Sequence, residues 1–152
     1  MCTSFLGELM TATHNFGTAP TRGTSAADTF KAALYLTTAT INASTTAYSA
    51  TGEVTGTNYS AGGTTITNAT PPASTNSSST AGVGYWTPSA SITYTNVTLS
   101  TAFDSVLVYN STQSNKAVSV HTFGSQTITA GNFTLTMPSN TTTTALLRLS
   151  TT

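Results

Sequence analysis

Few side chains in this 152-residue sequence could take part in acid–base, nucleophilic or metal chemistry, namely Cys2, Glu8, His14, Asp28, Glu53, Asp104 and His121. An enzyme needs several such groups with tuned pKa values and a fixed mutual arrangement. These seven are spread along the chain, without a nucleophile elbow or a paired-histidine motif. We therefore expect no enzymatic activity, no catalytic residues, no cofactor and no metal site. His14 is interpreted as a hydrogen-bond donor at the end of a helix.

One aromatic cluster could bind a ligand without acid–base chemistry. Tyr85, Trp86 and Tyr94 lie close together in sequence and could form a platform for glycans. Core packing is the simpler interpretation, because a Trp beside a Tyr in a strand usually fills a β-sandwich or a subunit contact.

The charge composition excludes two classes of partner. The net charge is +0, and the four basic residues are Arg22, Lys31, Lys116 and Arg148, which are scattered along the chain. No basic patch for nucleic acid or an anionic membrane is expected from them. Charged residues make up 5% of the chain, so little repulsion would keep copies apart. This composition favours a protein that works inside an assembly.

The N-terminal residues predict a short helix. Phe5, Leu6, Leu9 and Met10 recur at helical spacing between residues 4 and 13. A helix this short must bury its apolar stripe against something else. It either covers one end of its own β-core, which is the favoured reading, or docks on a neighbouring subunit.

The rest of the sequence predicts strands. Ser and Thr exceed a third of the residues, and β-branched Thr fits a pleated surface better than a helix. Alternating apolar residues and turn residues predict strands near 28–36, 53–55, 64–67, 83–86, 92–97, 105–109, 117–120, 127–129, 133–137 and 145–149. Turns are expected at residues 110–115, 124–125 and 130–132. We expect one all-β domain, a β-sandwich or a jelly-roll-like barrel with a short N-terminal helix.

The predicted domain has three parts. Residues 1–16 form a helical N-terminal arm and residues 28–150 form the β-core. Residues 68–80 contain a Pro-Pro pair and a Ser/Thr/Asn tract, which is typical of an exposed loop. The N-terminus has neither a basic segment nor a long apolar core, so no signal peptide is expected. No stretch is long and apolar enough to span a membrane. These features predict a product that is made and kept in the cytoplasm.

Several stretches resemble a group of small virion structural proteins of tailed bacteriophages. They are Asp28–Tyr35, Thr46–Tyr48, Glu53–Gly56, Tyr59–Gly63, Val108–Thr112, Asn115–Ala117, Phe123–Ser125 and Phe133–Leu135. The likeness covers most of the chain in the same order. It breaks between Asn68 and Gly84, and this chain has an unusually low charge.

The resemblance implies a β-rich particle protein without catalytic residues. Among such roles we favour a capsid decoration, or cement, protein on the outer surface of the virion. It would bind the major capsid protein and itself, as a homotrimer. The expected interface residues are Phe5, Leu6, Leu9, Met10, Tyr85 and Trp86. The alternatives are a tail or head-to-tail joining protein, and a receptor-binding or adhesin module that uses the aromatic cluster.

Overall fold

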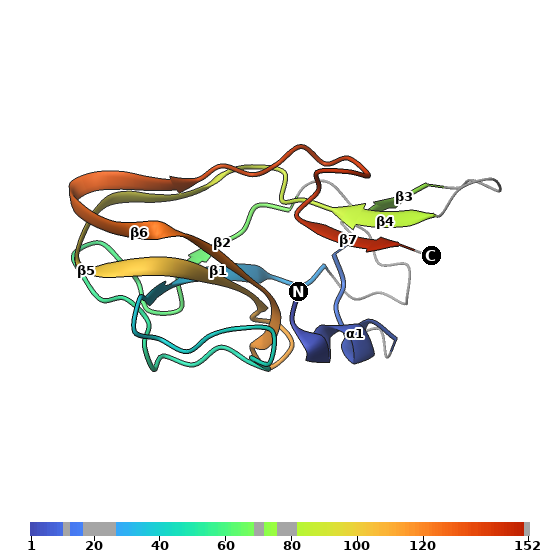
Figure 1. Cartoon of the computed structure of the whole chain (residues 1–152), viewed down its shortest axis with the longest axis horizontal. Helices are drawn as coiled ribbons and strands as arrows, with labels where there is room; N and C mark the ends of the chain where they lie inside the picture. The colour runs from blue at the N-terminus through green and yellow to red at the C-terminus, as the bar shows by residue number, and fades with distance from the viewer. Residues whose placement is uncertain (11–12, 17–26, 69–71, 76–81, 151–152) are drawn as a thin grey trace.

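The computed structural model describes residues 1–10, 13–16, 27–68, 72–75 and 82–150. In these residues the chain forms one short helix and two antiparallel sheets (Figure 1). The elements are α1 (Thr3–Met10), β1 (Phe30–Leu36), β2 (Thr64–Thr65), β3 (Ala73–Ser74), β4 (Val83–Trp86), β5 (Ile92–Asn110), β6 (Lys116–Leu135) and β7 (Leu147–Ser150). The prediction of an all-β, sandwich-like domain with a short N-terminal helix is confirmed.

The larger sheet has the strand order β2-β1-β5-β6. Its central strand β1 carries apolar side chains on both faces, and five of its seven residues are buried. β1 pairs with the second half of β5 from Phe30↔Asn110 to Leu36↔Phe103. A strand that is covered on both faces must be almost continuously apolar, as the sequence Phe-Lys-Ala-Ala-Leu-Tyr-Leu is.

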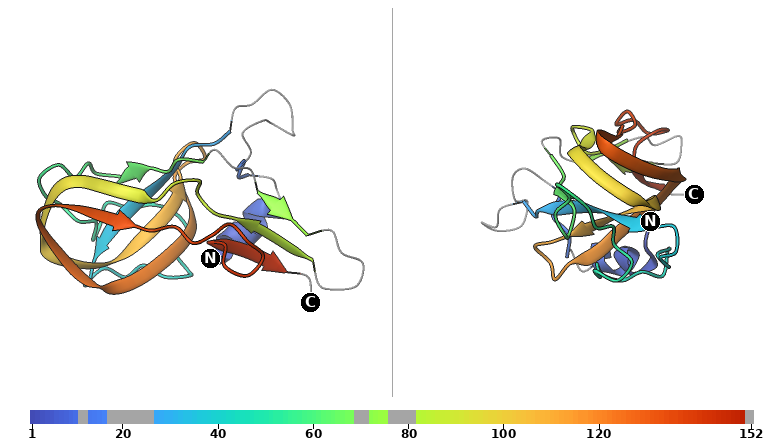
Figure 2. Two further views of the ribbon diagram at one scale, coloured as in Figure 1. Left: turned by 90° about the horizontal axis from the view of Figure 1, so that it is seen from above. Right: turned by 90° about the vertical axis from the view of Figure 1, so that its left-hand side faces the viewer.

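β5 and β6 form a long hairpin that curls back over the sheet, as Figure 2 (left) shows. The predicted turn between them is present at residues 111–115, where Ser114 and Asn115 adopt positive φ angles. The turns predicted at 124–125 and 130–132 are wrong, because both segments lie inside β6. The ladder shifts register there, so the residues form bulges that bend the strand without ending it.

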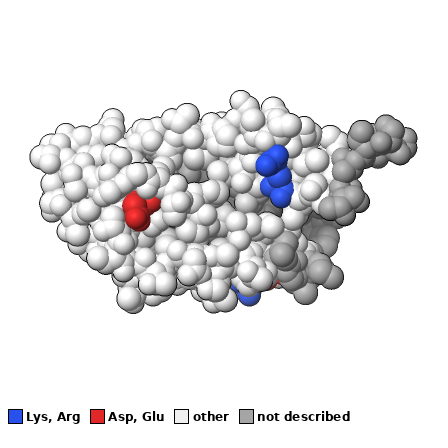
Figure 3. All heavy atoms as spheres, in the orientation of Figure 1, with Lys and Arg blue, Asp and Glu red and all other residues white. Residues whose placement is uncertain are grey.

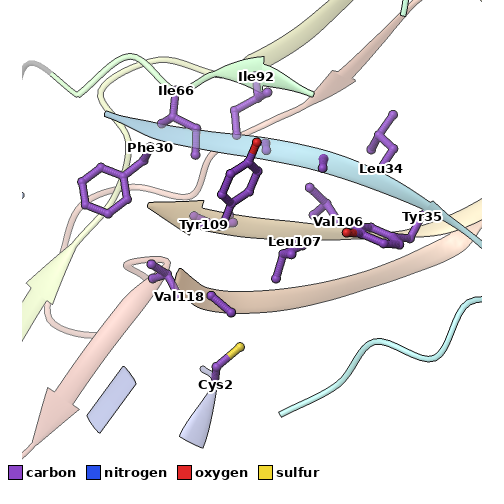
Figure 4. Packing of buried hydrophobic residues seen from close by; sticks show 14 of the residues in the cluster. Cys2, Phe30, Leu34, Tyr35, Ile66, Ile92, Val106, Leu107, Tyr109 and Val118 are labelled. Atoms are coloured by element: carbon purple, nitrogen blue, oxygen red, sulfur yellow. The ribbon is translucent and has the colours of Figure 1, made fainter. Parts of the chain in front are cut away.

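The core lies between the two halves of this curled hairpin and around β1. Its largest fully buried side chains include Tyr35, Phe5, Phe30, Phe103, Leu34, Leu99 and Leu107. Figure 4 shows several core side chains gathered around β1, β5 and β6. Gly63 approaches this core closely, because an added Cβ would lie 1.7 Å from the carbonyl oxygen of Ala32.

The smaller sheet has the strand order β3-β4-β7 and extends to one end of the molecule (Figure 1). Its first strand, β3, lies within the predicted loop 68–80, and both of its residues are exposed. β4 and β7 were predicted, and they pair from Val83↔Ser150 to Trp86↔Leu147. The predicted strand at 53–55 is reduced to a single bridge between Tyr35 and Glu53.

A set of packed rings connects the two sheets and the N-terminal segment, namely Phe5, Phe16, Phe30 and Trp86. The ring of Phe16 stacks on Phe30 of β1 at 4.4 Å between centroids and lies 4.7 Å from Trp86 of β4. Phe5 of α1 meets Phe16 edge-on at 6.0 Å. The helix therefore covers part of its own β-core, the reading that the sequence favoured.

The surface carries very few charges. Figure 3 shows a face on which Lys, Arg, Asp and Glu form only small, separated patches. None of the described helices is long and apolar enough to cross a membrane.

Candidate interaction surface

The first group of candidate residues fastens α1 to the start of β6. Oε1 of Glu8 accepts a hydrogen bond from Lys116 Nζ at 2.8 Å, and Oε2 pairs with His14 Nε2 at 2.8 Å. Partial burial opposes ionisation of Glu8, but the bonds from Lys116 and His14 outweigh it and lower its pKa. The helix-end interpretation of His14 fits this geometry, with His14 linking two parts of the same fold.

The same network continues to Asp28. Nδ2 of the fully buried Asn110 lies 3.1 Å from His14 Nδ1 and donates to Asp28 Oδ2 at 2.7 Å. Because an amide nitrogen only donates, Nδ1 of His14 is the acceptor and Nε2 carries the proton given to Glu8. The backbone N–H of Asn15 and the side-chain NH₂ of Gln113 also donate to the carboxylate of Asp28. These polar groups join the N-terminal segment to the β5–β6 turn.

Glu53 forms a second polar cluster, which we did not predict. Its buried carboxylate accepts bonds from the hydroxyls of Tyr48 (2.6 Å) and Tyr59 (2.7 Å) and from the amide of Gly62 (2.8 Å). Burial raises the pKa of both tyrosines, and the nearby carboxylate raises it further. A lone acid in a charge-poor chain, with a Tyr five residues before it and another six residues after it, was the available sequence signal.

The other candidates are separated from these clusters. Cys2 is buried, which raises the pKa of its thiol. Burial lowers the pKa of His121, whose Nε2 lies 2.9 Å from Ser119 Oγ. Asp104 is half-buried on β5. The described residues contain no group of three His, Cys, Asp or Glu side chains that could hold a metal ion. Arg22 lies outside the described residues.

The proposed glycan platform does not form. Trp86 is 3% exposed and donates its indole N–H to Asn68 Oδ1 at 2.8 Å. Tyr94 is 5% exposed, stacks on Tyr59, and donates its hydroxyl to the carbonyl of Ala32 at 2.7 Å. Neither ring offers a free face to a sugar. Trp86 and Tyr94 are core residues, which was the simpler of the two interpretations, whereas Tyr85 is half-buried.

The expected interface residues divide by exposure. Phe5 and Trp86 are buried at 2% and 3% exposure, so neither can present its whole side chain to a partner. Leu9 and Tyr85 are half-buried. The side chains of Leu6 and Met10 lie outside the described part of the structure. Cys2, Phe5 and Phe16 belong to the core, so we expect a deletion of residues 1–16 to destabilise the β-fold itself.

Four of these six residues nevertheless meet in one groove. Phe5 and Leu9 of α1 and Tyr85 and Trp86 of β4 all line one concavity of about 140 Å³. The lining is otherwise made of Met1, Phe16, Pro72, Ala73, Gly84, Leu147, Arg148 and Leu149. Helix α1 and the smaller sheet therefore build a shared surface from segments that lie far apart in the sequence.

The rim of this groove holds the most exposed large apolar side chains of the described residues. Met1 and Leu149 are each 41% exposed, and both line the groove. Arg148 is its single charged lining residue, and its guanidinium donates to the Thr142 carbonyl at 3.3 Å. An apolar concavity with an exposed apolar rim is typical of a contact surface for another macromolecule.

Comparisons with known proteins identify no relative: no family model matches the chain, and neither the curated proteins nor the solved structures contain a significant match.

Proposed function

We propose that this chain is a structural component of a tailed-bacteriophage particle that decorates the capsid. The motifs that resemble small phage virion proteins support the particle role. The partners would be the major capsid protein and further copies of the chain, on the outer surface of the virion. A homotrimer on a local threefold axis remains our prediction for the assembled state.

The observation that carries the proposal is the groove between α1 and the smaller sheet. It gathers Phe5, Leu9, Tyr85 and Trp86 below the exposed side chains of Met1 and Leu149. Contact residues in protein interfaces are enriched in aromatic residues, Met and Arg around an apolar centre. This groove has that composition, with Arg148 as its only charged lining residue.

The low charge of the chain suits wide contact with a shell. Burying an ion is costly unless it is paired, whereas a hydroxyl can be satisfied by a strand neighbour. Thr93 and Thr134 illustrate this, because their hydroxyls hydrogen-bond across β5 and β6 at 3.1 Å. An interface of ~1,000 Å² per copy, repeated over a shell, would oppose the internal pressure of packaged DNA.

The charged side chains also support a structural role. Glu8, Asp28 and Glu53 each accept hydrogen bonds that hold segments of the fold together. A side chain held this way contributes to stability in its observed position.

A binding assay on particles tests the proposal. Capsids from the source phage that lack the chain would be incubated with purified wild type, with Leu149→Lys and with the control Thr95→Lys. Leu149 lies on the groove rim, whereas Thr95 is an exposed β5 residue outside the groove. Wild type and Thr95→Lys should bind at equal occupancy, and Leu149→Lys should bind at least ~10-fold more weakly, which corresponds to about 1.4 kcal/mol.

Two results would contradict the proposal. Equal occupancy of Leu149→Lys and wild type would remove the groove from the contact. Binding of the wild type to tails or isolated necks, with none on capsids, would favour the head-to-tail or tail role instead. Circular dichroism and thermal melting of the three proteins would show that each is folded.

A further inference from the structure

β6 is an edge strand whose outer side is largely unpaired. It is the last strand of the order β2-β1-β5-β6, and β5 is its only partner in the sheet. At its start, Ala117 N donates to the Thr46 carbonyl, and the Val118 carbonyl accepts from Cys2 N. Beyond Val118, no described backbone group hydrogen-bonds to the outer edge of β6. A row of peptide groups is therefore left for another strand.

The free edge is regular where it begins. Pairing with β5 runs without a shift through Ser119, Val120, His121 and Thr122. A bulge at Val118 precedes this run, because Ser119 pairs with Val108 and Ala117 with Tyr109, and a second bulge follows at Phe123–Ser125, opposite Asp104. Residues 119–122 therefore form a straight segment to which a second strand can add.

This edge lacks the features that usually prevent strand addition. Proteins protect free edges with charged side chains, above all Lys, and with Pro. After Lys116, the sequence of β6 from 117 to 135 contains no Lys, Arg, Asp, Glu or Pro. Bulges interrupt β6 at Val118 and from residue 123 onward, and they leave residues 119–122 between them. For residues 119–122 the chain shows no such protection.

An open apolar cavity lies beside the same segment. It has a volume of about 330 Å³, and both halves of β6 line it, with His121 and Thr122 from one and Phe133 and Leu135 from the other. Val106, Phe123, Met137 and Leu146 complete most of its apolar wall. The cavity thus shares His121 and Thr122 with the free segment of β6, so a strand added there would lie beside its wall.

The chemistry of the edge selects its partner. A strand with charged residues would have to desolvate them against this uncharged wall, which is costly. Among the described strands, β1 and the second half of β5 are paired on both sides, and the first half of β5 is bridged by Thr57 at Thr98. β2 and β3 have two residues each, and β7 carries Arg148. β6 is long, uncharged after its first residue and free on its outer side beyond Val118, so a second copy can offer it the same segment.

We propose that two copies of this chain associate through their β6 strands, antiparallel across a twofold axis at residues 119–122. The contact is isologous, so each copy offers the same segment and lies beside the other's cavity. With a net charge of +0, the two copies approach without electrostatic repulsion. This inference concerns the free chain in solution and does not rest on the proposed role in the virion or on the homotrimer predicted there.

Sedimentation velocity of the purified full chain over a ~100-fold concentration range tests the pairing, because mass action then separates monomer from dimer. The variant Thr122→Lys places a charge at the mouth of the cavity, and Thr122 is exposed in the monomer. The control Thr95→Lys adds the same charge on β5, away from both the cavity and the β6 edge. Wild type and Thr95→Lys should form dimers, and Thr122→Lys should dissociate with a Kd at least ~10-fold higher.

Hydrogen exchange of the wild type supplies a readout that needs no variant. The outward-facing amides of residues 119–122 should exchange faster on dilution, while the amides of β1 should not change. The proposal is overturned by a wild type that stays monomeric throughout, by any oligomer whose mass Thr122→Lys leaves unchanged, or by exchange at 119–122 that is independent of concentration.

Discussion

The hydroxyl of Tyr59 donates a 2.7 Å hydrogen bond to Oε1 of Glu53, a buried carboxylate in the connection between β1 and β2. The same hydroxyl accepts a 3.0 Å bond from the Leu34 amide of β1. Tyr48 and Gly62 donate to the carboxylate as well. One acid therefore holds the long β1–β2 connection against the sheet.

Replacing Glu53 with Gln should destabilise the fold. All of its observed partners donate, so the new NH₂ group would face a donor and one buried bond would be lost. We expect Glu53→Gln to lower the free energy of unfolding by about 2–3 kcal/mol. Urea denaturation would measure the change. Tyr59→Phe should also destabilise, whereas Tyr85→Phe, whose hydroxyl has no hydrogen bond to described residues, should stay within ~0.5 kcal/mol of wild type.

Asn110 is the central donor of the N-terminal network. Asn110→Asp keeps its size but places a carboxylate beside Asp28, to whose Oδ2 the amide now donates at 2.7 Å. We expect a loss of about 3 kcal/mol at pH 7, because the site is fully buried. Asn115→Asp is the matched control, since Asn115 is exposed and Asp tolerates its positive φ. Equal thermal stability of the two variants would show that the network contributes little.

Replacing Gly63 with Ala tests how closely the β1–β2 connection packs on β1. The φ of Gly63 is +71°, and an added Cβ would lie 1.7 Å from the Ala32 carbonyl oxygen and 2.7 Å from Ala33 Cα. Gly63→Ala should therefore cost about 3 kcal/mol or more. Gly124→Ala is the control, because a Cβ there meets nothing within 4 Å. Chemical denaturation of the two variants would compare them, and a neutral Gly63→Ala would contradict the packing.

His121 should make stability depend on pH. Burial lowers its pKa in the folded state, so the unfolded chain binds a proton at a higher pH than the folded chain. The contribution of neutral His121 to the free energy of unfolding is fully present above the pKa of a free histidine, about 6.5. It is lost as the pH falls below that value. The free energy of unfolding should decline from pH 7 to pH 5 in the wild type. In His121→Gln this decline should be reduced, and an identical slope would refute the assignment.

Much of the fold could be predicted because its main signals are local. Alternating apolar residues identified β1, and the Asn- and Ser-rich stretch identified the turn between β5 and β6. The error at 124–125 and 130–132 has a physical cause. Gly, Asn and Ser suit both turns and bulges, and only the opposite strand decides between them. Asn96 on β5 lies in a bulge opposite Asn132, and the backbone N–H of Asn96 donates a hydrogen bond to Asn132 Oδ1 at 2.8 Å.

The candidate surface was less predictable. Helical spacing selected Phe5 and Leu9, but it could not show that the packing of Phe16 between Phe30 and Trp86 brings α1 beside the smaller sheet. The exposed rim residue Leu149 was assigned only to a strand. Its contribution depends on the pairing of β7 with β4, a long-range contact without a local signature.

The central claim is that this charge-poor β-fold is built into the capsid surface. A cryo-electron microscopy reconstruction of the intact source phage, with mass spectrometry of the purified particles, tests it most directly. Density for the two-sheet fold should lie on the outside of the head, with Leu149 and the groove against the major capsid protein. Purified particles that lack the chain, or density for it only at the neck or tail, would contradict the account.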